Sequence, residues 1–259
     1  MIGRIFGDRR RLAILRRVDR PAAVLIAILQ AIVAAIGWFA VEPVVLAITI
    51  AAQLALGGLA AAYVIGPARP DSGLARYAMP AVAGIAATVF GRLIPGGVSV
   101  LLVPILAVLL WSVTYLELRL ARGTGGRTIQ NLLLTAIVFT GAWGLLGYFG
   151  AQTWPSPVLL LAILTVPLAI RAAEARGALG AEAVGQAVLH VLVVVQVGLA
   201  VSLLNVQLQL TAAIIALAFY TWGGAVDALR GDASGRAVAA EFGSLMLIGL
   251  VAGLLLTRP

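Results

Sequence analysis

Few side chains in this chain could perform chemistry. There is one histidine, His190, and no cysteine, and all 18 basic residues are arginine. The absence of lysine excludes Schiff-base and Walker-lysine mechanisms, and the absence of cysteine excludes thiolate and iron–sulfur chemistry. An ordinary zinc site needs three or four ligands, which one histidine does not provide. We therefore predict no metal site and no bound cofactor.

The acidic residues do not form a catalytic motif. An aspartate-rich prenyl-transfer motif would place several carboxylates on one loop to hold Mg²⁺. The predicted loops offer single acids instead, at Asp71, Glu174, Glu182 and Asp232. Ser244 is the only serine that pairs attractively with His190, and no glycine-framed nucleophile turn accompanies it. We predict no catalytic residues, which disfavours an enzyme without excluding one.

The remaining polar groups include a set on one apolar segment. At 100° per residue, a helix places five residues within an arc of about 160°: Gln186, His190, Gly198, Ser202 and Asn205. Gln196 lies on the opposite side. We expect this face to turn toward other helices, where His190 is either a neutral hydrogen-bonding group or a proton-sensitive, ligand-lining one.

Four charged residues lie near the ends of apolar segments. They are Arg92, Glu117, Asp227 and Glu241. Charged groups in membrane proteins reach the headgroup layer from such positions, and a long arginine side chain does so by extending along the helix. We predict that all four are helix-end groups.

The composition decides which elements must position these groups. Of 259 residues, 62% are hydrophobic and 11% are charged, whereas soluble domains are closer to half apolar and a quarter charged. The net charge of +8 comes from arginines beside apolar segments, a pattern that fits anionic lipid headgroups better than nucleic acid. The chain is predicted to be an all-α polytopic transmembrane helical bundle.

A span needs about 20 mostly apolar residues, and the sequence offers nine candidates. They are Ala22–Val41, Val44–Ile65, Tyr77–Ile94, Val98–Leu118, Ile129–Phe149, Pro157–Ile170, Ala183–Leu204, Gln207–Ala228 and Ala237–Thr257. The third and sixth are the shortest. We predict a basic segment at 1–21 that is not a cleaved signal peptide, followed by one transmembrane domain at 22–259 with no soluble domain.

The arginines predict the orientation. Sixteen of the 18 precede the first span or lie in the even-numbered connections, and only Arg92 and Arg258 lie on the other side. Positive residues accumulate in the cytosol, so we expect a cytosolic N-terminus and an external C-terminus in a bacterial inner membrane. The outward turns are very short, which predicts four tight hairpins and a final helix.

Arginines also recur at a fixed interval. Arg16, Arg69, Arg122, Arg176 and Arg230 are 53 or 54 residues apart. Either an ancient duplication or the fixed length of a two-span hairpin would produce this spacing.

The sequence carries no motif of a recognised family, and three classes of function stay open. The first is a non-catalytic structural or assembly subunit of a membrane complex, favoured by the scarcity of ionisable groups. The second is a transporter or flippase for a lipidic or small apolar solute. The third is a lipid-modifying membrane enzyme. The expected partners are membrane lipids, including anionic headgroups at the cytosolic face, and partner membrane subunits.

Overall fold

The computed structural model describes residues 2–66, 73–121, 126–150, 156–204, 206–231 and 233–256, with the backbone alone for 2–20, 97, 121, 127 and 156. Every regular element in these ranges is a helix. In chain order they are α1 (Ile2–Phe39), α2 (Pro43–Leu54), the π-helix η1 (Ala55–Ala60), α3 (Ala61–Ile65), the 3₁₀-helix η2 (Ala75–Tyr77), α4 (Met79–Gly91), α5 (Gly96–Ala121), α6 (Arg127–Phe149), α7 (Ser156–Ala175), α8 (Ala181–Ser202), α9 (Leu208–Arg230) and α10 (Gly235–Leu256).

Eight segments in the described part of the chain are long and apolar enough to cross a membrane. Each contains 19 to 23 residues, and α2, η1 and α3 together make one of them, Pro43–Ile65. These segments indicate a multi-pass membrane protein. Of the nine predicted spans, the third is the one outside this set, because α4 has only 13 residues.

Proline and glycine mark several helix ends. Pro43 opens α2 directly after Glu42, whose extended backbone ends the preceding turn. Gly66 ends α3 with a φ of 78°, a backbone conformation that suits glycine because it has no Cβ. Prolines 21, 104 and 167 lie inside α1, α5 and α7, which continue through them.

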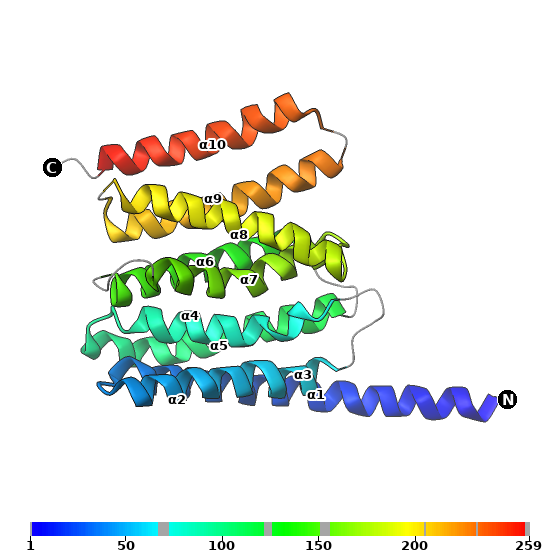
Figure 1. Cartoon of the computed structure of the whole chain (residues 1–259). Helices are drawn as coiled ribbons and strands as arrows, with labels where there is room; N and C mark the ends of the chain where they lie inside the picture. The colour runs from blue at the N-terminus through cyan, green and yellow to red at the C-terminus, as the bar shows by residue number, and fades with distance from the viewer. Residues whose placement is uncertain are drawn as a thin grey trace.

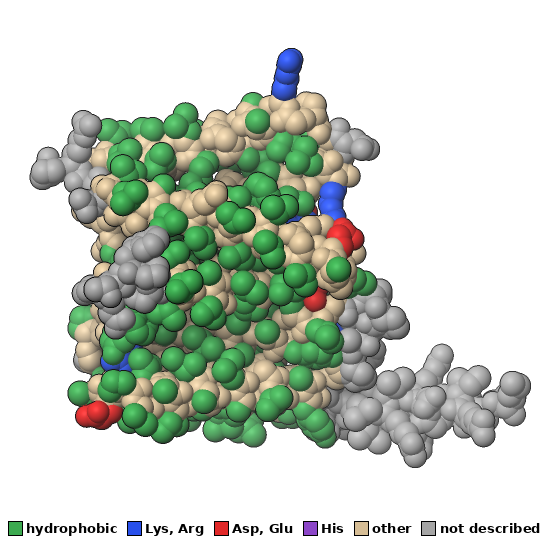
Figure 2. Space-filling model, viewed as in Figure 1, with side chains coloured by type: hydrophobic (Ala, Val, Ile, Leu, Met, Phe, Trp, Pro, Cys, Tyr) green, Lys and Arg blue, Asp and Glu red, His purple; other side chains and the backbone are tan. Residues whose placement is uncertain are grey.

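The helices lie side by side with roughly parallel axes (Figure 1). They form a stack with α1, α2 and α3 at one edge and α10 at the other, as the blue-to-red colouring shows (Figure 1). Helix α1 packs along α5, α4 along α6, α6 along α9, and α7 along α8. The surface seen in Figure 2 is mostly hydrophobic, with charged side chains near the two ends of the helices.

Short α4 is the most enclosed helix of the stack. Ten of its 13 residues are buried, including Gly84 and Thr88, and it packs against α1, α2, α5 and α6. Small residues permit this close approach. A Cβ on Gly57 would lie 2.4 Å from the Ala81 backbone, and one on Gly144 would lie 2.5 Å from the Phe90 nitrogen. Backbone contact through glycine is how helices pack tightly in lipid.

The π-helix is the feature that no sequence pattern predicted. Residues Ala55–Ala60 widen the helix between α2 and α3, and Gly57 at its centre is buried against α4. A π-helical turn disrupts the regular i→i−4 bonding and is often retained at a place of functional or packing demand. Here it lies beside α4, where the closest backbone approach in this layer occurs.

Candidate functional site

A buried ion pair joins α5 to α7. Glu117 is 1% exposed and Arg171 is 7% exposed. The guanidinium of Arg171 donates to both carboxylate oxygens of Glu117. Nη2 donates to Oε2 at 2.7 Å, and Nε lies 3.1 Å from Oε1 and from Oε2. Gln130 of α6 also lies beside Arg171. When its side-chain amide is assigned with the oxygen toward the guanidinium, that oxygen accepts from Nε and Nη2 at 3.1 Å.

Two further charges extend this pair toward the start of α4. Glu174 accepts from the backbone N–H of Ala75 at 3.0 Å and lies 3.9 Å from Nη1 of Arg171. Arg76 is 1% exposed, and its Nη2 donates to the carbonyl of Gly66 and to the Tyr77 hydroxyl. We call Arg76, Glu117, Gln130, Arg171 and Glu174 the charge cluster.

The charge cluster contains two cations and two anions, so its net charge is zero. Removing four charges from water costs several kcal/mol per ion, which is offset only if the geometry is good and the hydrogen bonds are satisfied. Arg171 meets that demand for Glu117. Arg76 Nε, Arg76 Nη1 and one oxygen of Glu174 are buried with no hydrogen-bond partner among the described residues. The bonds that are made join α5 to α7 through Glu117 and Arg171, and α7 to η2, just before α4, through Glu174.

A second polar group lies within the apolar layer between α1, α2 and α4. Gln30 Nε2 donates to Gln53 Oε1 at 3.1 Å and to the Pro80 carbonyl at 3.0 Å. Gln53 Nε2 in turn donates to the Gln30 carbonyl at 2.8 Å and to Thr88 Oγ1 at 3.3 Å. All three side chains are fully buried. Such amide pairs hold helices together in lipid because an unbonded amide there is costly.

His190 is a buried hydrogen-bonding group. It is 0% exposed, its Nε2 lies 2.9 Å from the Phe219 carbonyl, and its ring stacks on Phe219 with centroids 4.1 Å apart. A carbonyl only accepts, so Nε2 carries the proton and donates. Nδ1 has no partner in the described structure. His190 thus makes a hydrogen bond between α8 and α9.

The rest of the predicted polar face does not converge on His190. Gly198 is buried, Ser202 is exposed, and Gln186 is half-buried and bonds to Glu182 of its own helix. Gln196 is exposed on the opposite side of α8. Asn205 lies outside the described residues. Gly198 and Ser202 line one cavity, and neither Gln186 nor His190 lines it with them.

The four predicted helix-end charges have four different environments. Arg92 bridges the ends of α1 and α6, donating to the Gly37 carbonyl at 2.7 Å and to the Tyr148 hydroxyl at 2.9 Å. Asp227 lies 3.8 Å from Nε of Arg176. Glu241 is exposed on α10. Glu117 differs most from a helix-end group in the headgroup layer, because the continuation of α5 to Ala121 places it inside the protein.

Sequence reasoning did not single out the residues that carry most of the buried polarity. Arg76 and Arg171 were assigned to loops, and Gln30, Gln53 and Gln130 were passed over. A signal was available for the glutamines, since each lies in an apolar segment and must find a partner there. No pattern in the sequence indicated which partner.

The described residues contain no group of three or more histidine, cysteine or acidic side chains that could hold a metal ion. Comparison with protein-family models, with curated proteins and with solved structures finds no match to this chain. Function must therefore be argued from the geometry of the chain itself.

Proposed function

We propose that this protein is a non-catalytic integral membrane protein that serves as a structural or assembly subunit of a membrane complex. The observation that carries the proposal is α10, a 22-residue helix with only two buried residues, Val238 and Gly253. It packs on α9 through small residues, where Gly249 meets Leu217 and Gly253 meets Ile214. Helix α10 lies at the edge of the stack (Figure 1), and the proposal places a partner on its other side.

The open side of α10 carries polar groups as well as apolar ones. Glu241 and Ser244 are exposed, and Ile248 and Leu255 follow them along the helix with 65% and 61% of their surfaces exposed. Glu241 lies six residues after Gly235, which is about 9 Å along the helix axis. A carboxylate at that depth is expensive in lipid unless it is paired. We infer a partner transmembrane helix with an arginine, a lysine or another hydrogen-bond donor at this level.

The same proposal includes nine crossings, with α4 as the third. At 1.5 Å per residue, α4 alone is about 20 Å long, yet its neighbours support a full crossing. At one end, Arg76 bonds to Gly66, where α3 stops. At the other end, Arg92 bonds to Gly37 near the end of α1. Because α4 is surrounded by protein, its length need not match the lipid.

Arginine asymmetry supports a cytosolic N-terminus in the inner membrane of a bacterium, with four hairpins and an external C-terminus. An externally active reporter should be active when fused after Gly97 or Pro259, and inactive after Gly125 or Gly180. Activity after Gly180 would overturn the orientation.

A transporter is the second candidate, supported by one cavity. A hollow of about 330 Å³ near the starts of α7 and α9 is lined in part by Gly198, Ser202 and Thr211. Polar groups at the end of a bundle could receive a solute. The test is uptake of a lipidic fluorophore into proteoliposomes that contain the protein. Uptake by the wild type that is abolished in Ser202→Leu would favour transport over the subunit role.

Photo-cross-linking tests the subunit proposal. A photoreactive amino acid is placed at Ile248 on α10, and the control carries it at Leu59, which is 78% exposed on η1. We expect a cross-link to one defined protein from Ile248 only, with a basic or donor residue at the linked segment. Cross-links to lipid alone from Ile248 would contradict the proposal.

A further inference from the structure

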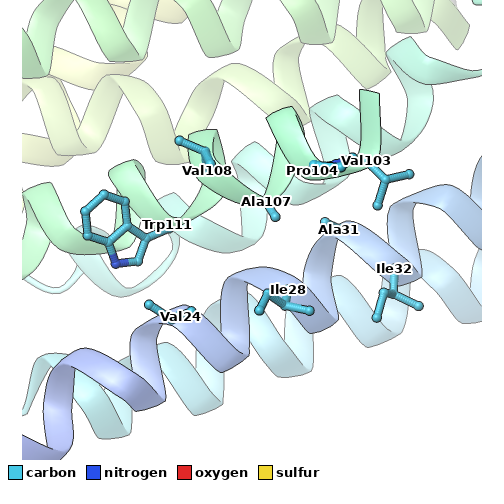
Figure 3. A pocket seen from close by; sticks show the side chains of 9 residues that line it. All are labelled: Val24, Ile28, Ala31, Ile32, Val103, Pro104, Ala107, Val108 and Trp111. Carbon is cyan, nitrogen blue, oxygen red and sulfur yellow. The ribbon is translucent and has the colours of Figure 1, made fainter. Parts of the chain in front are cut away.

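A groove of about 610 Å³ runs between α1 and α5 (Figure 3). Its walls are hydrocarbon. Val24, Ile28 and Ile32 line it from α1, and Val103, Val108 and Trp111 line it from α5. The three α1 residues are 42–46% exposed, so the groove is open along its side. Because both helices belong to apolar spans, the surrounding solvent is lipid chains.

Small side chains create the groove. Ala31 of α1 and Ala107 of α5 lie toward each other between the two helices, with larger residues on both sides (Figure 3). From Val24 to Ile32 the groove follows eight residues of α1, which is about 12 Å of helix. A single extended hydrocarbon chain fits such a space, whereas a helix with side chains has a diameter of about 10–12 Å and does not.

One end of the groove holds a single buried polar atom. The indole nitrogen of Trp111 is turned toward α1 at the Val24 end (Figure 3), and it is buried without a hydrogen-bond partner among the described residues. An indole N–H is a donor only, so an acceptor beside it would be favourable.

Positive charge lies beyond that same end. Trp111 stacks on Tyr115 with centroids 5.1 Å apart, and the guanidinium carbon of Arg119 lies 5.8 Å from the Tyr115 ring centre. Arg119 is eight residues beyond Trp111 on α5. A basic residue near the membrane surface attracts an anionic headgroup.

We propose that the α1–α5 groove binds an acidic phospholipid, with one acyl chain between the helices and the phosphate at the Arg119 end. The Trp111 N–H donates to an ester or phosphate oxygen. The chain gains van der Waals contacts rather than hydrophobic transfer, since its alternative surroundings are also apolar. Selectivity for the lipid therefore comes from charge. This site is separate from α10 and does not rest on the proposed subunit role.

Native mass spectrometry of the full chain, released from nanodiscs of phosphatidylglycerol or of phosphatidylcholine with the same chains, tests the proposal. We expect the wild type to retain phosphatidylglycerol in preference. Val108→Trp, which fills the groove, should lose the bound-lipid peak. Leu109→Trp is the matched control, because Leu109 has nearly the same exposure, 56% against 59%, and lies outside the groove. It should retain the lipid.

Two further variants separate headgroup from chain. Arg119→Gln should weaken retention of phosphatidylglycerol about fivefold and leave phosphatidylcholine unchanged. Trp111→Phe should weaken the retention of phosphatidylglycerol and of phosphatidylcholine by a similar factor, because both lipids carry ester and phosphate oxygens. Equal retention of the two lipids by the wild type, or equal lipid loss in Val108→Trp and Leu109→Trp, overturns the proposal. So does a cross-linker at Val108 that captures a protein chain instead of lipid.

Discussion

Helices α4 and α10 are both apolar and rich in small residues, yet their surroundings are opposite. Ten of the 13 residues of α4 are buried, against two of the 22 residues of α10. Glycine shows the contrast directly. A Cβ on Gly84 of α4 would collide with Gln53, whereas one on Gly243 of α10 would meet nothing within 4 Å. Helix α10 packs closely on α9 at Gly249 and Gly253, but its opposite side, where Gly243 lies, has no such contact.

Polar side chains explain the difference. The charge cluster holds η2, directly before α4, and α4 itself is bonded to the Gln30–Gln53 pair at Pro80 and Thr88. Helix α10 has apolar contacts with α9, and its carboxylate at Glu241 is exposed. In lipid, helices associate through packing and hydrogen bonds rather than through the hydrophobic effect. An apolar helix without buried polar bonds is therefore free to take a partner from another chain.

The largest expected effect comes from breaking the charge cluster. Arg171→Met leaves the Glu117 carboxylate buried without its partner, and we expect the free energy of unfolding to fall by about 3–5 kcal/mol. The double variant Glu117→Leu/Arg171→Met should recover much of this loss. Reversible unfolding in mixed detergent micelles measures the change.

Arg230→Met is the matched control for that experiment. Arg230 also forms an ion pair, with Glu182 at 2.7 Å, but both side chains are substantially exposed. We expect a loss of less than about 1 kcal/mol. Equal losses in Arg171→Met and Arg230→Met would show that the cluster contributes no more than a surface pair.

A smaller effect is expected from packing around α4. Gly144→Ala places a methyl group against the backbone of Phe90, which cannot move aside cheaply, so stability should fall by about 1–3 kcal/mol. Gly243→Ala on α10 adds the same methyl group in open space and should cause no loss. A thermal unfolding series in detergent compares the two. If Gly243→Ala is as damaging as Gly144→Ala, the two helices do not differ as described.

Much of the helical architecture could be predicted from hydropathy alone. The predicted segment Ala183–Leu204 corresponds to α8 at Ala181–Ser202, and Gln207–Ala228 to α9 at Leu208–Arg230. Hydropathy works here because lipid leaves the backbone few alternatives to helix. Helix α4, with 13 residues, is shorter than a lipid-facing span needs to be, and protein surrounds it. The number of crossings, the hairpins and the orientation stay predictions.

The candidate site could be predicted only in part. His190 was recognised as a polar group at membrane depth, and its partner is a backbone carbonyl, which no sequence pattern identifies. Glu117 was expected at a helix end. Its burial could not be predicted, because α5 is apolar on all sides and periodicity does not show which face of the helix is turned inward. Its partner Arg171 is 54 residues away. Such pairings depend on how the helices pack.

A modest stability effect is expected at His190, which joins α8 to α9. His190→Leu removes the donor to the Phe219 carbonyl and should lower the free energy of unfolding by about 0.6–2 kcal/mol. His190→Gln keeps a donor and should retain wild-type stability. Both are measured by the same detergent unfolding. Loss of a cellular phenotype in His190→Gln at unchanged stability would instead indicate a functional histidine.

The mass of the native assembly tests most directly whether α10 is a contact surface. Membranes are solubilised in mild detergent, and the complex is weighed by native mass spectrometry for the wild type, Glu241→Ala and Glu42→Ala. Both variants remove one exposed carboxylate, but Glu42 lies in the turn before α2. We expect the wild type and Glu42→Ala to carry a partner chain and Glu241→Ala to lose it. A partner that remains bound to Glu241→Ala, or a wild type that carries none, would contradict the role of α10.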